Sequence, residues 1–177
     1  MFDLDGTIIN GDVSRFVFFQ CSSRLKLRFS IIRFFYGSDA FRLVLNSYVE
    51  SMDFQAIEKD FRRFLDLNKK QDLIPQIAAL RQRHILILNS GSPQQLVDSA
   101  ALYFGFDFAF GSSSILLNIG DQKVQNITSQ EILRLKNRCL AVSDNPEDIS
   151  WMSSFETSVF IQPGKILNDF GCTREHI

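Results

Sequence analysis

The sequence lacks several features that mark specialised classes of protein. It contains no long uncharged apolar run, and acids rather than a basic stretch stand near its start, so we expect no membrane span and no signal peptide. A formal net charge of -1 gives no basic excess for binding nucleic acid. The three cysteines are widely spaced and follow no metal-binding pattern, so we expect reduced thiols in a cytoplasmic protein.

What the sequence does have is the composition of one ordinary globular domain, with 45% hydrophobic residues among 177. After Pro75, short apolar runs alternate with amphipathic segments, which is typical of a doubly wound α/β fold with a parallel sheet. We predict helices at 75–84, 93–104, 128–137 and 146–154, alternating with strands at 85–89, 107–111, 139–143 and 158–162. The first strand of the same sheet is expected at residues 1–4.

Residues 12–73, which separate this first strand from the others, have a different character. Apolar residues at helical spacing predict two helices before Tyr36, and Gly37-Ser38-Asp39 predicts a stop followed by a helix cap. Two further helices are expected at 40–52 and 54–67. We therefore predict a small four-helix unit at 12–73, inserted into a sheet domain made of residues 1–11 and 74–177.

The stretch from Val13 to Tyr36 holds five basic residues, several phenylalanines and no acid. It has two interpretations. Its aromatic rings can pack the core of the helical unit, which we favour, or its helices can lie on an anionic lipid surface. The second interpretation predicts a membrane-surface binding module, or an enzyme with a peripheral membrane contact.

Polar residues stand at the ends of the predicted strands, where ligands bind in open parallel sheets. Asp3 and Asp5 alternate with apolar residues, so their side chains leave an extended segment on the same side. Ser90 and Gly91 follow the strand at 85–89 and lead into a helix N-terminus, which favours an anion. Taken alone, each of these residues also fits an ordinary turn or helix cap.

Two more acids, Asp144 and Asp148, follow the strand at 139–143, so the strand ends carry four carboxylates in all. Carboxylates held close together repel one another unless a cation lies between them. Oxygen ligands without histidine or cysteine select a hard ion, and we expect Mg²⁺. Lys123 and the helix N-terminus after Ser90 would then hold a phosphoryl group.

These residues resemble the motifs of the haloacid dehalogenase-like (HAD) superfamily. FDLDGT is similar to its first motif, ILILNSGSP to its second, and SDNPED to its fourth, with Ser143 in place of a glycine. Lys123 lies 21 residues before Asp144, a spacing that the family uses for its third motif. A helical cap after the first motif resembles the phosphoserine phosphatase-like branch, so the resemblance implies a Rossmann-like HAD core with that cap.

The resemblance also implies an activity, namely Mg²⁺-dependent hydrolysis of a phosphomonoester through an aspartyl-phosphate on Asp3. A phosphotransferase or mutase of the same superfamily is the alternative. Asp5 is the implied acid and base. The other implied roles are phosphate binding by Ser90, Gly91 and Lys123, and metal binding by Asp3, Asp5, Asp144 and Asp148.

Substrate selection is expected to come from the cap. Asp12 stands where phosphoserine phosphatases carry a substrate-binding glutamate, and Arg42 is a second candidate. The long apolar and basic cap and the string SGSPQQLV look more like phosphatidylglycerophosphatase-type members of the branch. The expected substrate is thus a small phosphorylated molecule, with lipid-derived phosphates included. The sequence does not decide the oligomeric state.

Overall fold

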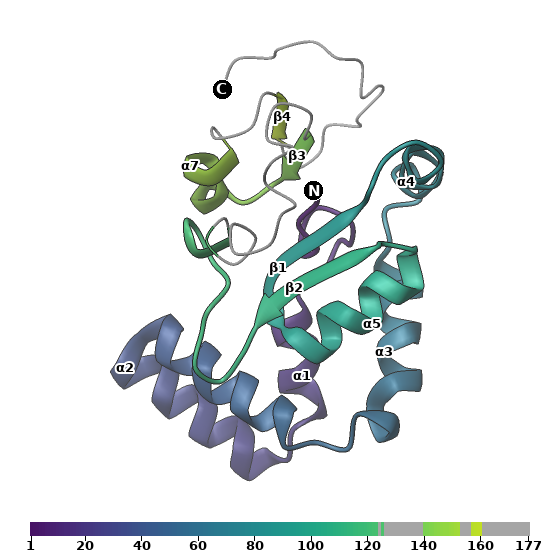
Figure 1. Ribbon diagram of the computed structural model, residues 1–177. Coiled ribbons are helices and arrows are strands. Elements are labelled where there is room, and N and C mark those ends of the chain that lie inside the picture. The colour runs from purple at the N-terminus through teal and green to yellow at the C-terminus, as the bar shows by residue number, and fades with distance from the viewer. Residues whose placement is uncertain (124, 126–139, 153–156, 161–177) are drawn as a thin grey trace.

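A computed structural model describes residues 1–123, 125, 140–152 and 157–160, and every structural statement below refers to them. Helices and parallel strands alternate after the first helices, as the sequence predicts (Figure 1). The elements in order are α1 (Val13–Gln20), α2 (Ser23–Glu50), α3 (Phe54–Asn68), α4 (Ile74–Arg81), β1 (Ile87–Pro93), α5 (Gln94–Phe104), β2 (Phe108–Ser112), β3 (Leu140–Ser143), the 3-10 turn η2 (Pro146–Asp148), α7 (Ile149–Met152) and β4 (Thr157–Phe160). The helix expected at 128–137 lies outside the described residues.

The parallel sheet is built from two pairs of strands, β1 with β2 and β3 with β4. The segment expected as the first strand joins the pairs through one residue, because Phe2 forms parallel bridges to both Leu88 and Val142. Phe2 donates to the carbonyl of Ile87 over 2.8 Å and accepts from Asn89 over 2.8 Å. On the other side, the N–H of Asp3 donates to the carbonyl of Val142, and the N–H of Val142 donates to the carbonyl of Met1, each over 2.9 Å. The backbone of Asp3 therefore lies in the middle of the sheet, between the two strand pairs.

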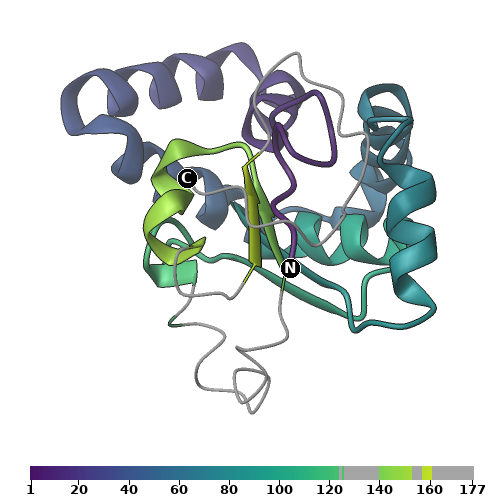
Figure 2. The ribbon, with the colours of Figure 1, turned by 90° about the horizontal axis from the view of Figure 1, so that it is seen from above.

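Helix α2 is 28 residues long and reverses direction at Gly37. Gly37 has φ 85° and ψ -178°, a conformation that L side chains rarely adopt, so the expected stop at this glycine is found inside the element. Figures 1 and 2 show the two arms of α2 lying side by side as a hairpin. In the described part of the chain, neither α2 nor another helix is long and apolar enough to cross a membrane.

A single apolar cluster runs from the sheet into the helices that precede it. Leu88, Val142 and Phe2 contribute from the sheet, and Phe61 and Leu65 contribute from one face of α3. Helix α5 packs on β1 and β2, and α3 packs on α5. This shared core holds the helices of residues 12–73 beside the strand ends.

The aromatic residues of the stretch from Val13 to Tyr36 do not all enter this core. Phe16 and Phe29 are buried, as expected for rings that pack the helical unit. The same expectation is wrong for Phe34, Phe35 and Tyr36, which are 82%, 70% and 75% exposed. These three residues end the first arm of α2, directly before the turn at Gly37, and the buried residues resume only at Phe41 in the second arm.

Candidate active site

A pocket of about 450 Å³ lies at the strand ends, between the sheet and the first helices. It is lined by almost all of the residues that the sequence predicts as site residues, namely Asp3, Asp5, Asp12, Ser90, Gly91, Lys123 and Asp144. Asp148 is the exception, because it is fully buried behind Lys123. The strand β1 continues through Ser90 and Gly91 to Pro93 rather than ending at Asn89, with an irregular register after Asn89.

Lys123 is the buried cation of this site. Its Nζ donates to Asp3 Oδ1 over 3.1 Å and to Asp148 Oδ2 over 2.6 Å, and the residue is only 2% exposed. Burial alone would lower the pKa of Lys123, but attraction to the two carboxylates outweighs it and raises the pKa. Lys123 therefore stays charged at neutral pH, with its ammonium group directed between two acids.

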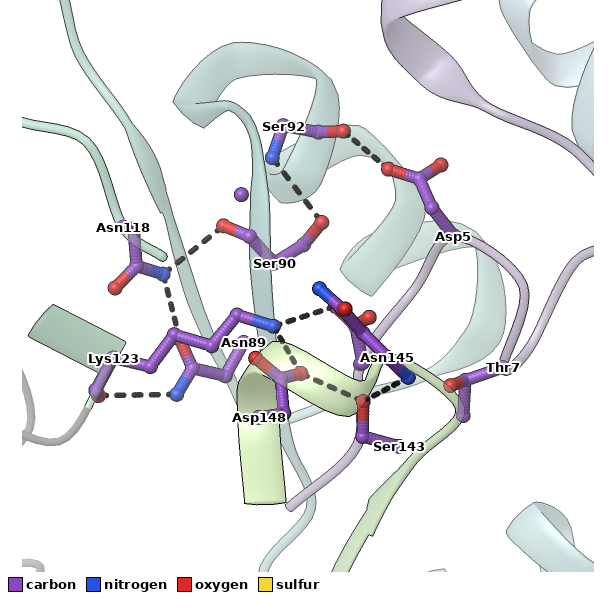
Figure 3. A network of polar contacts seen from close by, with 12 residues as sticks. Asp5, Thr7, Asn89, Ser90, Ser92, Asn118, Lys123, Ser143, Asn145 and Asp148 are labelled. Carbon is purple, nitrogen blue, oxygen red and sulfur yellow. Dashed lines mark hydrogen bonds and ion pairs between the residues drawn. The ribbon is translucent and has the colours of Figure 1, made fainter. Parts of the chain in front are cut away.

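Asp148 is fixed by a second donor, because Ser143 Oγ reaches the same Oδ2 atom over 2.6 Å (Figure 3). Ser143 in turn accepts from the backbone N–H of Asn145 over 3.2 Å. The other oxygen, Asp148 Oδ1, is buried and has no hydrogen-bond partner among the described residues. The serine that stands in place of the family's glycine thus supports Asp148 and, through it, Lys123.

Asp3 is a buried carboxyl group beside this ammonium. Burial raises its pKa, the nearby charge of Lys123 lowers it, and the charge of Asp148 raises it, with a balance of about 6. At neutral pH Asp3 is therefore mostly ionised, which is the form that acts as a nucleophile. Its place immediately after Phe2 fixes its backbone to the centre of the sheet.

Asp5 is held by donors on both of its carboxylate oxygens. The backbone N–H of Val13, at the start of α1, donates to Oδ1 over 2.8 Å, and Ser92 Oγ donates to Oδ2 over 2.6 Å. Burial raises the pKa of Asp5 to about 7, although the bond from Ser92 opposes the shift. A carboxyl group with this pKa exchanges protons near neutral pH, as general acid and base catalysis requires.

Asp144 packs against the turn that follows Asp5. Thr7 Oγ1 donates to Asp144 Oδ1 over 2.8 Å, and the backbone N–H of Asp144 returns a bond of 3.0 Å to the same hydroxyl. Gly6 has φ 73°, and a Cβ atom there would lie 1.9 Å from Asp144 Oδ2. Gly6 and Thr7 of the first motif therefore position the carboxylate of Asp144: Gly6 leaves room for it, and Thr7 donates a hydrogen bond to it.

The metal ligands expected from the sequence are not gathered as one cluster. Among the described residues, no three side chains of histidine, cysteine, aspartate or glutamate are placed to hold a metal ion together. The carboxylate of Asp5 is occupied by two donors, and Asp148 Oδ2 by two more. Asp3 and Asp144 remain on the pocket wall, and these two carboxylates suit Mg²⁺, which is bound by one or two carboxylates and keeps several waters.

An asparagine pair, which no sequence motif indicates, holds the segment around Lys123 against the sheet. Asn89 Nδ2 donates to the carbonyl of Lys123 over 3.1 Å (Figure 3). Asn118 donates to Asn89 Oδ1 over 2.6 Å and to the carbonyls of Ser90 and Phe110 over 3.0 Å each. Both asparagines are 0% exposed, so their bonds are shielded from water.

The opposite wall of the pocket comes from the first helices. Arg33, Phe41 and Arg42 reach it from α2, and Asp12 from the start of α1. Asp12 Oδ1 accepts from the backbone N–H of Arg15 over 3.1 Å and so caps α1. Asp12, expected to bind substrate, lines the pocket and serves as this helix cap at the same time.

Comparisons with known proteins agree with this architecture. The sequence matches the model of the haloacid dehalogenase-like hydrolase family over residues 1–153. A solved structure titled as a phospho-aspartyl intermediate analogue of phosphoserine phosphatase is similar, with 16% identity, a TM-score of 0.59 and coverage of 90% of this chain and 83% of that one. A HAD family hydrolase from Salmonella enterica subsp. enterica serovar Typhi has 12% identity, a TM-score of 0.53 and coverage of 87% and 58%. No curated protein matches the sequence.

Proposed function

Because the chain belongs to the haloacid dehalogenase-like hydrolase family, we propose that it is a Mg²⁺-dependent phosphatase that hydrolyses a phosphomonoester through an aspartyl-phosphate on Asp3. The observation that carries the proposal is the buried bond of 3.1 Å from Lys123 Nζ to Asp3 Oδ1. A permanent cation beside an ionised carboxylate at the end of a central strand suits attack on an anionic phosphoryl group.

In the first step, an oxygen of Asp3 attacks phosphorus and the bond from phosphorus to the ester oxygen breaks. Asp5, with a pKa of about 7, gives its proton to the leaving oxygen, so the alcohol departs neutral. Lys123, the Ser90 hydroxyl and the Gly91 N–H bind the three remaining phosphoryl oxygens as charge moves onto them. All four of these residues line the pocket with Asp3.

In the second step, a water attacks the phosphorus of the aspartyl-phosphate. Asp5, now ionised, takes a proton from that water while the bond between phosphorus and Asp3 breaks. The products are inorganic phosphate and the regenerated carboxylate of Asp3. Ser92 and the Val13 N–H keep Asp5 in one position for both steps, because each of them donates to a different oxygen of its carboxylate.

The metal would be held by Asp3, the main-chain carbonyl of Asp5 and Asp144. When bound there, Mg²⁺ offsets the repulsion between the attacking carboxylate and the phosphate. Thr7 orients Asp144 for this role. Asp148 is buried behind Lys123 and does not line the pocket, so it would support a bound metal through the groups around it rather than as a direct ligand.

The helices of residues 12–73 form the cap of the proposed enzyme over a core made of residues 1–11 and 74–177. The pocket wall from α2 carries Arg33 and Arg42, two cations that face the proposed phosphate site across the pocket. Such cations favour a substrate with negative charge beyond the reacting phosphoryl group. Asp12 and Arg42 are the residues proposed to select among small phosphorylated molecules.

Phosphate release from p-nitrophenyl phosphate tests the proposal. Wild-type protein should release phosphate with Mg²⁺ and lose this activity in EDTA. Asp3→Asn, which keeps the side-chain shape, should reduce turnover by at least about 10³-fold, while Asp60→Asn on exposed α3 should leave it unchanged. Wild-type turnover in Asp3→Asn would exclude Asp3 as the nucleophile. Transfer of the phosphoryl group to an added alcohol in preference to water would identify a phosphotransferase instead.

A further inference from the structure

The outer face of the first arm of α2 is apolar and exposed. It consists of four residues at the spacing that places side chains on one side of a helix, namely Leu27, Ile31, Phe34 and Phe35. Their exposed fractions are 64%, 46%, 82% and 70%. Phe34 and Phe35 also contact each other edge to face, with ring centroids 5.0 Å apart. We call these four residues the outer face.

The opposite side of the same arm is apolar as well, and it is already covered. Phe29 is 2% exposed and packs edge to face on Phe41 and Tyr48 of the second arm, with centroid distances of 6.0 and 5.8 Å. A helix with apolar residues on both sides is normally covered on both sides. The outer face therefore has the composition of a contact surface rather than of a solvated one.

The stretch of chain that carries the outer face has charge of one sign, and the first acid after it is Asp39, beyond Gly37. Residues 13–38 contain five basic residues and no acid, and Arg24 and Arg28 fall on the same side of α2 as the outer face by helical spacing. Both arginines are exposed. Nearby, the exposed ring of Phe19 has Arg15 and Lys26 at 5.9 and 5.8 Å from its centroid. A partner for this surface must carry negative charge and accept aromatic rings.

We propose that the outer face of α2 docks on an anionic lipid bilayer. Aromatic and aliphatic side chains of an amphipathic helix enter the boundary between headgroups and acyl chains, and the flanking cations bind lipid phosphates. The arm lies in the plane of the membrane without crossing it, which agrees with the absence of a spanning helix in the described residues. A second copy that met this one through the same face would bring the basic residues of both chains together, so the acid-free, aromatic surface fits an anionic bilayer better.

Docking on lipid would also orient the pocket relative to the membrane surface. Arg33 and Ser38 line the pocket and flank the exposed rings of Phe34 and Phe35 in the sequence. The residues that bind lipid and the residues that line the pocket therefore share one turn of the α2 hairpin. A docked protein holds its pocket mouth close to the headgroups. The docking itself does not depend on the proposed chemistry, so the two proposals are tested separately.

Cosedimentation of the full chain with vesicles, in the absence of any phosphate ester, tests the docking. The protein should bind phosphatidylcholine vesicles that contain phosphatidylglycerol, bind pure phosphatidylcholine vesicles at least about tenfold more weakly, and dissociate as salt rises. Arg24→Gln with Arg28→Gln should weaken binding about fivefold per charge. The matched control, Lys59→Gln with Arg63→Gln, removes two exposed cations at the same spacing from α3 and should bind as wild type does.

The apolar contribution is tested with Phe34→Ser and Phe35→Ser together, which should weaken vesicle binding about tenfold or more. Leu67→Ser with Leu102→Ser removes two residues that are 75% and 74% exposed on other helices and should change nothing. The proposal is overturned if wild-type protein stays in the supernatant with anionic vesicles, or if the outer-face variants sediment as wild type does. Loss of a dimer in Phe34→Ser, Phe35→Ser, without vesicle binding by wild type, would assign the face to a second copy instead.

Discussion

The hydroxyl of Ser92 donates to Asp5 Oδ2 over 2.6 Å and joins two residues that lie 87 positions apart in the chain. Ser92 is itself 1% exposed, so this bond is shielded from water. This bond connects Asp5, the proposed general acid and base, to the C-terminal end of β1. The N–H of Val13 connects the same carboxylate to α1. The position of Asp5 thus depends on the sheet and on the helical cap together.

Loss of the Ser92 hydroxyl should change the pH dependence of catalysis. In wild type, kcat/KM should fall below about pH 6 as Asp3 becomes protonated and above about pH 7 as Asp5 loses its proton. The bond from Ser92 stabilises ionised Asp5, so Ser92→Ala raises the pKa of Asp5 and moves the alkaline limb upward by roughly half to one pH unit. Profiles of kcat/KM against pH measure this shift. An alkaline limb that stays in place in Ser92→Ala, as it should in the exposed control Ser47→Ala, would contradict it.

Removal of the buried ammonium should destabilise the fold strongly. Lys123→Met keeps most of the side-chain volume but leaves Asp3 and Asp148 without their cation, which should lower the free energy of unfolding by about 3–5 kcal/mol at pH 7. Asp3, with a pKa of about 6, can become neutral when the pH falls, so the loss should be smaller at pH 5. Urea unfolding at both pH values measures the difference. A loss of less than about 1 kcal/mol at pH 7 would mean that the ion pairs do not hold the fold.

Gly6 and Gly37 offer a matched pair of substitutions. Both have positive φ, so each substitution by alanine should cost about 1–3 kcal/mol of stability, and at Gly37 no atom lies within 4 Å of the added Cβ. At Gly6 the added Cβ would in addition displace the carboxylate of Asp144. We expect Gly6→Ala to raise the Mg²⁺ concentration for half-maximal activity at least about tenfold, and Gly37→Ala to leave it unchanged. Equal Mg²⁺ requirements in the two variants would argue against a metal role for Asp144.

The raised pKa of Asp5 has a consequence for stability. Because its pKa is about 7 in the folded state and near 3.8 in an unfolded chain, the folded state binds the proton more tightly. The associated stability is fully present below about pH 4 and is lost as the pH rises through 7. In EDTA, Asp5→Asn should therefore be more stable than wild type at pH 7, by about 4 kcal/mol, and equal to it near pH 4. A stability difference between the two proteins that does not change with pH would contradict the assignment.

Much of the site is predictable because its residues follow periodic patterns. Asp3 and Asp5 share a side of an extended segment, and residues that follow parallel strands meet at one edge of the sheet. These two rules bring Asp3, Ser90 and Asp144 to one pocket from segments far apart in the chain. No such rule predicts that Lys123 belongs to the site. That prediction rests on its distance of 21 residues from Asp144, a spacing that the family uses.

Other parts of the site are set by contacts that no local pattern records. Asn118 lies in the loop after β2, and its role depends on three bonds to atoms of Asn89, Ser90 and Phe110. The first arm of α2 is a second case, because it is apolar on both sides. Helical spacing alone does not say which side the second arm covers, so the burial of Phe29 and the exposure of Phe34 follow only from the fold.

Phe2 is the residue that bridges the two strand pairs, so the protein can lose activity at this seam before it unfolds. If the backbone bonds of Met1, Phe2 and Asp3 across this seam open, β1 with β2 and β3 with β4 each keep their own pairing, and α5 stays packed on its pair. Ser90 and Asp144 then lose the backbone connection between their strands, and side-chain bonds such as those of Lys123 to Asp3 and Asp148 remain. Gentle heating should therefore inactivate the protein before the bulk of its helical signal is lost, and cooling should restore activity as long as the two halves have not aggregated.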